Sequence, residues 1–434
     1  MRKYLKPAAA LTVLTLAMSA CPSAEDGDSA VNEVAQADTG GLPALNIDLA
    51  STSVSGLSAG GFMAVQFHIA YSSILRGAAI FAGGPYDCAE GSLSTALTTC
   101  TTASPSPPDP SRAETDTRNF ASAGAIDDPS NLAGQRVFLF GGADDATVAP
   151  PVMDALASYY RFWVTHGDVH YESRRPGTAH TMPTIDYGGN CDVTGDPWIG
   201  KCNYDGAGAA LSEIYGTLAS PATTLSGQFV PMAQGAFLTS PASHSIADTG
   251  YAYIPKSCSD GARCRIHVAF HGCKQYATGS VADKFYKHAG YNEWADTNQI
   301  VMLYPQTIPT SGTNPNGCWD WWGYDNPDYA KRNGPQMAMV RRMIDALSGQ
   351  GGTDAGAGDA GDASDAASPA DAGKDSGTCF VANNFDHVAA GRAYVWFGYT
   401  FADGSNENMG LYSVGIVTSL RQIGPGDYVI GTCP

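Results

Sequence analysis

The pattern of apolar and polar residues alternates between two types of segment over residues 44–350 of this 434-residue chain. Short apolar runs with the length of buried strands occupy residues 52–54, 78–81, 137–140, 169–173, 266–270 and 300–304. Segments with helical apolar spacing occupy residues 59–71, 152–166 and 337–347. Because short buried strands alternate with helices in this way, the sequence predicts an α/β fold built on a parallel sheet.

Two low-complexity stretches bound this region. Residues 22–43 are acidic and lack apolar periodicity, and residues 351–378 consist mainly of Ala, Gly and Asp. Neither stretch can bury a core, so both are expected to be solvated tethers. They divide the chain into a large segment, residues 44–350, and a small one, residues 379–434.

Residues 1–21 have the features of an export signal. Three basic residues precede an apolar stretch over residues 8–20, which is too short to span a membrane. Residues 18–21 (MSAC) resemble a bacterial lipoprotein cleavage box, in which Cys21 would carry the lipid. The sequence predicts an exported protein, extracellular or at the cell surface as an outer-membrane lipoprotein, with plain secretion as the alternative to the lipid anchor.

Charge and composition narrow the classes of function. The chain has 24 Lys and Arg against 42 Asp and Glu, a net charge of −18, and 44% of its residues are hydrophobic. Such a chain can form a core but is a poor candidate for binding nucleic acid or an anionic membrane, since both need a basic face. No apolar run outside the signal reaches the length of about 18 residues that a membrane span needs.

A G-x-S-x-G pattern at residues 56–60 lies between a predicted strand and a predicted helix. Glycines two residues before and after Ser58 permit a sharp turn that exposes the hydroxyl and directs a helix N-terminus at it. The pattern alone is weak in a chain with 50 glycines, and an inert serine in a glycine-rich turn is the alternative. In its strand-to-helix context, Ser58 is a candidate nucleophile.

A serine nucleophile needs a base and an acid that orients the base. The run at 137–140 is followed by two candidate carboxylates, Asp144 and Asp145, and the run at 169–173 is followed by His180. The order Ser, Asp, His, with each residue after a strand, is that of α/β-hydrolases. The other histidines are more simply explained as surface or packing residues.

An oxyanion hole in such a site needs two backbone N–H groups. Ala59, the residue after the nucleophile, would supply one, and a His271-Gly272 loop after the run at 266–270 is suited to supply the other. This loop follows the serine, whereas α/β-hydrolases usually place it before the serine. The order therefore predicts a circularly permuted α/β-hydrolase, with two separate domains as the alternative.

Several blocks of the large segment together resemble the type 2 catalytic domain of extracellular polyhydroxyalkanoate depolymerases. The blocks are SGLSAGGFMAVQ (55–66), DATVAP (145–150), AHTMPT (179–184), CNYDGAG (202–208), FHGCKQ (270–275) and NGCWDW (316–321). The resemblance implies a circularly permuted α/β-hydrolase fold. It also implies that Asp145, rather than Asp144, is the acid and that the backbone of Cys273 is the second oxyanion donor.

The resemblance further implies the chemistry. Ser58 would attack the ester carbonyl of a short-chain polyhydroxyalkanoate, chiefly poly(3-hydroxybutyrate), with His180 as the base and Asp145 orienting it. We expect an insoluble polyester as the partner, a monomeric chain, and no cofactor or metal. The alternatives are a secreted esterase of another specificity, feruloyl or other polyester, and a non-catalytic polymer-binding surface protein.

The chain contains 11 cysteines, which leaves ten once Cys21 is set aside. An even number in an exported protein suggests five disulfides, although the sequence does not determine their connectivity. Pairing of neighbours suggests Cys88–Cys100, Cys191–Cys202, Cys258–Cys264, Cys273–Cys318 and Cys379–Cys433. Metal binding is disfavoured because the spacings are irregular and no C-x-x-C pair occurs.

Three tryptophans, Trp319, Trp321 and Trp322, directly follow Cys318. If Cys273 and Cys318 are bonded, these side chains are held beside the oxyanion hole. We hypothesise that one or more of them lines a substrate-binding crevice for a hydrophobic polyester chain. Ordinary packing in the core is the alternative.

The small segment, residues 379–434, is rich in aromatic side chains and has a cysteine near each end. The aromatic residues are Phe380, Phe385, Tyr394, Trp396, Phe397, Tyr399, Phe401, Tyr412 and Tyr428. Alternating stretches and Gly/Asn turns predict a small β-rich module stapled by one disulfide. It resembles the C-terminal modules of secreted bacterial depolymerases, which implies adsorption to the insoluble substrate through exposed aromatic residues; a structural or cell-surface role is the alternative.

Overall fold

The computed structural model describes residues 39–350, 379–396, 399–403, 405, 407–411, 416–424 and 427–431. The export signal with Cys21, most of the N-terminal tether, the linker and Cys433 lie outside these described residues. Leu42, assigned above to the tether, is only 2% exposed and packs in the core. Within the described ranges, no helix is long and apolar enough to cross a membrane.

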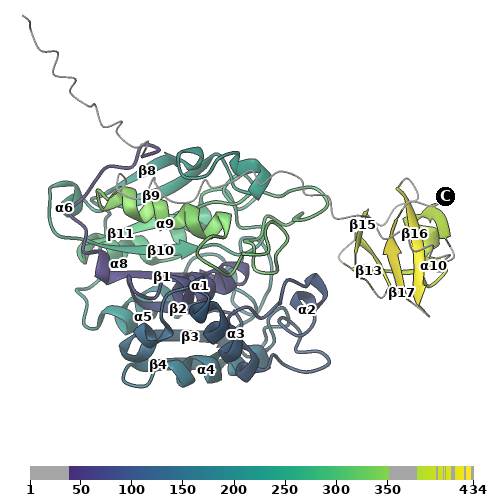
Figure 1. Ribbon diagram of the computed structural model, residues 1–434. Helices are drawn as coiled ribbons and strands as arrows, with labels where there is room; N and C mark the ends of the chain where they lie inside the picture. Colours follow the sequence, from purple (N-terminus) through teal and green to yellow (C-terminus); the bar gives the residue numbers. More distant parts are fainter. Residues whose placement is uncertain are drawn as a thin grey trace, which may run out of the picture. The chain divides into compact units, whose positions relative to one another are not determined.

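An eight-stranded sheet organises the large segment (Figure 1). In spatial order its strands are β4 (Asp168–Arg175), β3 (Arg136–Gly142), β2 (Leu75–Phe81), β1 (Thr52–Leu57), β10 (Arg265–Phe270), β11 (Ile300–Tyr304), β9 (Thr249–Ile254) and β8 (Gln228–Ala233). The pairings from β4 through β11 are parallel, as the sequence predicts. The sheet is mixed rather than wholly parallel, because β9 and β8 add to one edge in antiparallel orientation.

The two antiparallel strands were not expected from the sequence. β8 contains Pro231 and has one buried residue, Met232, whereas β9 contains Gly250. Proline is tolerated in a sheet at an edge, where its missing N–H costs no ladder bond, and glycine weakens the strand pattern. β8 is an edge strand without the continuous apolar run by which the buried strands could be recognised, whereas β9 lies between β11 and β8 and is mostly buried.

Strands β1 and β10 are neighbours at the centre of the sheet although they lie more than 200 residues apart in sequence. Their parallel register runs from Ser53 opposite His267 to Gly56 opposite Phe270. The strand that leads to Ser58 and the strand that leads to the His271-Gly272 loop therefore end side by side. The alternative of two separate domains is wrong, and the permuted order of a single α/β sheet is confirmed.

Helices cover both faces of the sheet (Figure 1). Side chains alternate between the faces: on β3, Val137 and Leu139 join one core cluster, whereas Phe138 and Phe140 join the other. The helices that contribute to the first cluster are α1 (Ala59–Ala70), α3 (Pro110–Ser122), α4 (Pro150–Trp163) and α9 (Pro335–Leu347). Those that contribute to the second include α5 (Gly206–Tyr215), α7 (Lys284–His288) and α8 (Tyr291–Thr297), together with Ala59 and Phe62 of α1 and Val152 of α4. Shorter elements are α2 (Leu93–Leu97), α6 (Lys256–Ser259), β5 (Met182–Thr184), β6 (Gly189–Asn190) and β7 (Ile199–Lys201).

The small segment forms a β-rich module, as expected. One three-stranded antiparallel sheet contains β12 (Cys379–Asn383), β16 (Val417–Gly424) and β17 (Asp427–Ile430). The other contains β13 (Ala393–Trp396), β14 (Tyr399–Ala402) and β15 (Asn408–Leu411). A short helix that was not expected, α10 (Asn384–Ala389), is capped by Asn383, whose side chain accepts the Asp386 N–H at 2.8 Å.

Candidate active site

Ser58 lies at the turn between β1 and α1 and has φ 57° and ψ −125°. A residue with a side chain rarely adopts this conformation, which costs about 1–3 kcal/mol and is typical of functional turns. The Ser58 N–H donates to the Phe81 carbonyl at 3.0 Å, and the Ser58 carbonyl accepts the Phe62 N–H at 3.0 Å. A Cβ on Gly56 would lie 2.0 Å from the Gly60 carbonyl oxygen, so the close contact of strand and helix requires this glycine.

Asp145 and His180 meet at the ends of β3 and β4. His180 Nδ1 is 2.8 Å from Asp145 Oδ2, and both side chains are at most 5% exposed. The other carboxylate oxygen of Asp145 accepts the N–H groups of Thr147 and Val148, each at 2.9 Å. Asp144 is exposed and takes no part in this contact. The structure thus places Asp145, and not Asp144, where it can orient the imidazole.

The loop after β10 presents a backbone N–H beside the serine. The Gly272 N–H donates to Gln275 Oε1 at 2.7 Å, and the Lys274 N–H donates to the Asn316 carbonyl at 2.7 Å. Among the hydrogen bonds of the described residues, none uses the Cys273 N–H between them. The loop is therefore fixed on both sides of an amide that remains available to a ligand.

A second available amide comes from the nucleophile helix. Ala59 is the first residue of α1, so its N–H has no acceptor within the helix. A Cβ on Gly272 would lie 3.4 Å from Ser58 Cβ, which shows how closely the β10 loop approaches the serine. Of the two predicted oxyanion donors, Ala59 thus adjoins Ser58 in the chain, and Cys273 belongs to the loop that approaches Ser58 in space.

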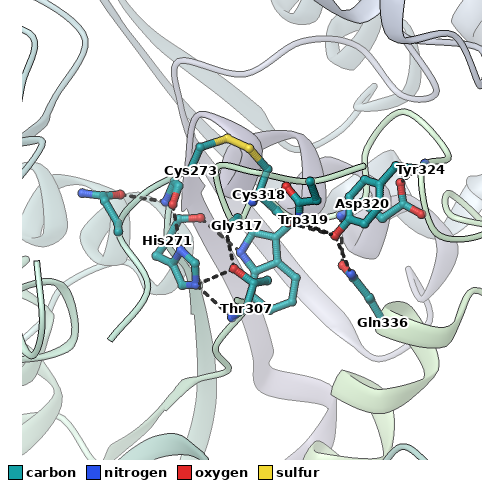
Figure 2. Close-up of a disulfide and its surroundings, with 12 residues drawn as sticks. His271, Cys273, Thr307, Gly317, Cys318, Trp319, Asp320, Tyr324 and Gln336 are labelled. Atoms are coloured by element: carbon teal, nitrogen blue, oxygen red, sulfur yellow. Dashed lines mark hydrogen bonds between the residues drawn. A yellow bond between two sulfur atoms is a disulfide. The ribbon is translucent and has the colours of Figure 1, made fainter. Parts of the chain in front are cut away.

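His271 supports this loop from inside the protein (Figure 2). Its Nδ1 is 2.8 Å from the Gly272 carbonyl oxygen, and its Nε2 accepts the Thr307 N–H at 3.2 Å. Burial lowers the pKa of His271 to about 4, so the imidazole is neutral at pH 7. A neutral ring with its proton on Nδ1 satisfies both contacts.

Ser58, His180, Ala59 and Cys273 line one cavity. Apolar side chains from several loops complete its walls in the large segment, namely Leu57, Phe62, Leu93, Leu97, Val148, Trp198, Trp321 and Trp322. The sequence analysis missed Trp198 and the two leucines of α2. They lie in segments with no motif of their own, and only the folded chain brings them to the serine.

The three predicted tryptophans separate into two groups. Trp321 and Trp322 line the cavity, and Trp321 stacks on Phe62 of the nucleophile helix with 4.0 Å between ring centroids. Trp319 is fully buried, and its indole N–H donates to the His271 carbonyl at 3.1 Å. Trp319 therefore packs behind the loop and is not among the residues that line the cavity.

Four disulfides link neighbouring parts of the large segment. The bonds in the described residues are Cys88–Cys100, Cys191–Cys202, Cys258–Cys264 and Cys273–Cys318, which are the pairings suggested by sequence proximity. The suggested partner of Cys379, Cys433, lies outside the described residues. The Cys273–Cys318 bond joins the oxyanion loop to the segment that carries Trp321 and Trp322 (Figure 2).

Comparisons with known proteins agree with this arrangement. No protein-family model matches the chain. A poly(3-hydroxybutyrate) depolymerase from Delftia acidovorans is 41% identical over 91% of this chain and 94% of its own length. A polyhydroxybutyrate depolymerase from Talaromyces funiculosus is 39% identical over 73% of this chain and 96% of its own length.

A solved structure shares the fold. It is a serine-to-alanine variant of a PHB depolymerase in complex with an R3HB trimer, 37% identical to this chain. The two superpose with a TM-score of 0.65 over 71% of this chain and 99% of the other. With a relative 41% identical along nearly the whole chain and this site geometry, the chain belongs to the poly(3-hydroxybutyrate) depolymerase family.

Proposed function

We propose that this protein is a secreted serine esterase that hydrolyses the ester bonds of short-chain polyhydroxyalkanoates, chiefly poly(3-hydroxybutyrate), to 3-hydroxy-acid monomers or oligomers. The observation that carries the proposal is the shared cavity of Ser58 and His180, with Asp145 bonded to the imidazole. The apolar walls of this cavity suit a neutral polyester chain. The R3HB trimer in the related structure supports the same class of substrate.

In the proposed mechanism, Ser58 Oγ attacks the ester carbonyl while His180 removes the hydroxyl proton. Asp145 holds His180 in the tautomer with its proton on Nδ1, so that Nε2 can accept. The N–H groups of Ala59 and Cys273 stabilise the negatively charged tetrahedral oxygen, each by about 3 kcal/mol. His180 then protonates the leaving alkoxide, and water releases the hydroxy acid from Ser58 by the same steps.

The decisive test is clearing of a poly(3-hydroxybutyrate) suspension by the wild-type chain and by Ser58→Ala. Wild type should clear the suspension and the variant should not, because the variant lacks the attacking oxygen. Equal clearing by both would refute the mechanism. Hydrolysis of soluble esters without clearing of polymer would favour an esterase of another specificity.

Trp321 and Trp322 are proposed to bind the polymer chain. Trp322 is 9% exposed, lines the cavity and contacts Trp321 edge-on with 5.4 Å between centroids. Trp322→Ala should raise KM for a soluble 3-hydroxybutyrate trimer while the far-UV circular dichroism stays unchanged. A variant that folds and turns over polymer normally would exclude this role.

The C-terminal module is proposed to adsorb to the insoluble polymer. Its exposed apolar side chains include Val381 (61% exposed), Val417 (64%) and Ile423 (60%). The register of β12 with β16 places Asn383 opposite Val417 and so puts Val381 and Val417 on one face of that sheet. Of the aromatic residues expected to be exposed, Phe385 is 45% exposed and Phe401 only 4%. The aliphatic face thus supports adsorption more directly than the aromatic residues do.

Adsorption can be tested in the full chain with Val381→Asp combined with Val417→Asp. This variant should lose binding to polymer granules in a pull-down but keep trimer hydrolysis, because the cavity is untouched. Ile185→Asp is the matched control, since Ile185 is an equally apolar side chain, 51% exposed, in the large segment. Unchanged granule binding by the double variant would contradict the proposal.

Export, anchoring, domain boundaries and oligomeric state also belong to the proposal. We propose that the chain is cleaved before Cys21 and that this cysteine is lipidated. We propose a hydrolase domain over residues 44–350 and a C-terminal module over residues 379–434. We also propose that the protein is a monomer. The match of the solved relative to 71% of this chain supports a hydrolase domain of about that length. Labelling with a palmitate analogue should mark wild type but not Cys21→Ala, and light scattering should give the mass of one chain.

A further inference from the structure

The segment that carries the two cavity tryptophans folds around one buried carboxylate. This tryptophan loop, residues 318–326, contains Asp320, which is 2% exposed. Its two carboxylate oxygens accept backbone N–H groups from Gly323 (2.8 Å), Tyr324 (3.0 Å), Asp325 (3.2 Å) and Asn326 (3.1 Å). The carboxylate therefore closes the turn that follows Trp321 and Trp322.

The backbone of Asp320 connects the same loop to two helices. Its carbonyl accepts the side-chain N–H of Gln66 on α1 at 3.0 Å. Its N–H donates to Gln336 Oε1 on α9 at 2.9 Å (Figure 2). The next residue, Trp321, stacks on Phe62, which also belongs to α1. Asp320 thus holds the tryptophan loop against the helix that begins at the reactive serine.

The surroundings of Asp320 both oppose and favour its charge. Burial is the main cause that raises its pKa to about 7, the backbone N–H groups of Asn326, Asp325 and Gly323 lower it in part, and the nearby Asp325 carboxylate raises it further. The other titratable groups around it are Tyr324, Tyr329 and His244, of which His244 pairs with Asp325 at 2.9 Å. Because the folded pKa is raised, the carboxylate is ionised and accepts all four donors only above about pH 7. Protonation turns one oxygen into a donor and weakens the loop.

We propose that ionised Asp320 positions Trp321 and Trp322 in the cavity and so determines the affinity of this enzyme for the polyester chain. The proposal rests on the function proposed above. It separates binding from chemistry, because among the described residues the Asp320 carboxylate bonds only within the tryptophan loop, whereas the oxyanion loop has its own hydrogen bonds at Gly272 and Lys274 in addition to the Cys273–Cys318 link. Loss of the carboxylate should therefore change substrate binding more than the chemical step.

The first experiment is kinetic and uses Asp320→Asn in the full chain. The asparagine keeps the shape but presents an NH2 group to two N–H donors, so the turn loses two of its acceptor contacts. KM for a soluble 3-hydroxybutyrate trimer at pH 8 should rise about tenfold, because the enzyme loses the binding free energy that is typical of one small apolar contact. We expect kcat to stay within about threefold of wild type. Asp328→Asn is the matched control, because that carboxylate is 44% exposed and pairs only with Lys331.

The second experiment is spectroscopic and does not depend on hydrolysis. Near-ultraviolet circular dichroism of Ser58→Ala, which reports the edge-on Trp321–Trp322 pair, should change with a midpoint near pH 7. The transition should be absent when Asp320→Asn is added. Asp325→Asn should move its midpoint to lower pH, since it removes the like charge that raises the Asp320 pKa.

The outcomes separate this proposal from the proposed function. A transition with the same midpoint in all three chains, or an Asp320→Asn enzyme that loses kcat with KM unchanged, would overturn the role of Asp320. If Asp320→Asn does not fold, the Asp325→Asn midpoint decides: a shift supports the proposal and no shift overturns it. Failure of wild type to hydrolyse polymer or trimer would refute the function while leaving the spectroscopic result readable.

Discussion

Replacement of Asp145 by asparagine is the sharpest test of the site geometry. Asp145 Oδ1 accepts two backbone N–H groups, from Thr147 and Val148, and Oδ2 faces His180 Nδ1 at 2.8 Å. In Asp145→Asn the amide oxygen must remain toward the two backbone donors, because the NH2 group cannot accept them. The NH2 group then faces His180 and donates to Nδ1, which forces the imidazole proton onto Nε2.

This inverted tautomer cannot accept the proton of Ser58. We expect kcat for a soluble 3-hydroxybutyrate trimer to fall about 10⁴-fold, as for loss of the correct tautomer in other serine hydrolases. That factor corresponds to about 5.5 kcal/mol of transition-state stabilisation. The free energy of unfolding should change little, because both backbone contacts of Oδ1 survive. The measurement is kcat at pH 8 together with urea unfolding of the same samples.

The neighbouring carboxylate gives a matched control. Asp144 is exposed and does not contact His180, so Asp144→Asn changes the local charge by the same amount without touching the imidazole. Its kcat should stay within about twofold of wild type, as for most surface substitutions. Near-normal activity of Asp145→Asn, or a large loss with Asp144→Asn, would refute the assignment of Asp145 as the orienting acid.

Three further predictions follow from close contacts, burial and covalent links. Gly60→Ala would place a Cβ 2.2 Å from the Phe270 carbonyl oxygen, so α1 must shift. We expect kcat/KM for the trimer to fall about 100-fold. Unchanged activity would contradict the need for this close contact. Burial lowers the pKa of His267 from 6.5 to about 3, so below pH 6.5 the unfolded chain binds a proton that the folded chain does not, and the urea midpoint should fall as the pH drops. The urea midpoint of His267→Gln should fall less steeply with pH. Equal slopes for the two chains would show that His267 does not cause this pH dependence. Replacing both cysteines of Cys273–Cys318 with alanine should lower kcat about tenfold. The same change at Cys258–Cys264 is the control and should lower only Tm. Equal kcat in the two variants would show that the Cys273–Cys318 disulfide does not position the oxyanion amide.

Parts of the candidate site were visible in the sequence because their geometry is local. The strand-to-helix turn at Ser58 needs glycines two residues away on each side, so the pattern itself indicates the turn. Order along the chain then located His180 after a strand. The local sequence did not distinguish Asp144 from Asp145, because both carboxylates lie in the same turn. Only the fold decides that the Asp145 side chain is the one buried beside the imidazole.

Other features depended on contacts between distant segments. The expected strands at 266–270 and 300–304 match β10 and β11, because buried parallel strands form continuous apolar runs. The expected helix over 152–166 ends earlier, at Trp163, and the antiparallel strands β8 and β9 were missed. β8 lies at the edge of the sheet with one buried residue, so its own residues carry little signal. β9 is mostly buried, and its place in the sheet depends on pairing with the distant strand β11.

Periodic apolar spacing, the turn that exposes Ser58 and the order of the reacting residues can all be recognised in the sequence. These features follow from interactions within a few residues, which a local pattern encodes. The tertiary structure alone decided that Trp321 and Trp322 face the cavity while Trp319 packs behind it, although the three are nearly consecutive. It also placed the Asp320 carboxylate at the centre of the tryptophan loop, because burial and hydrogen bonding of a side chain depend on which distant segments surround it.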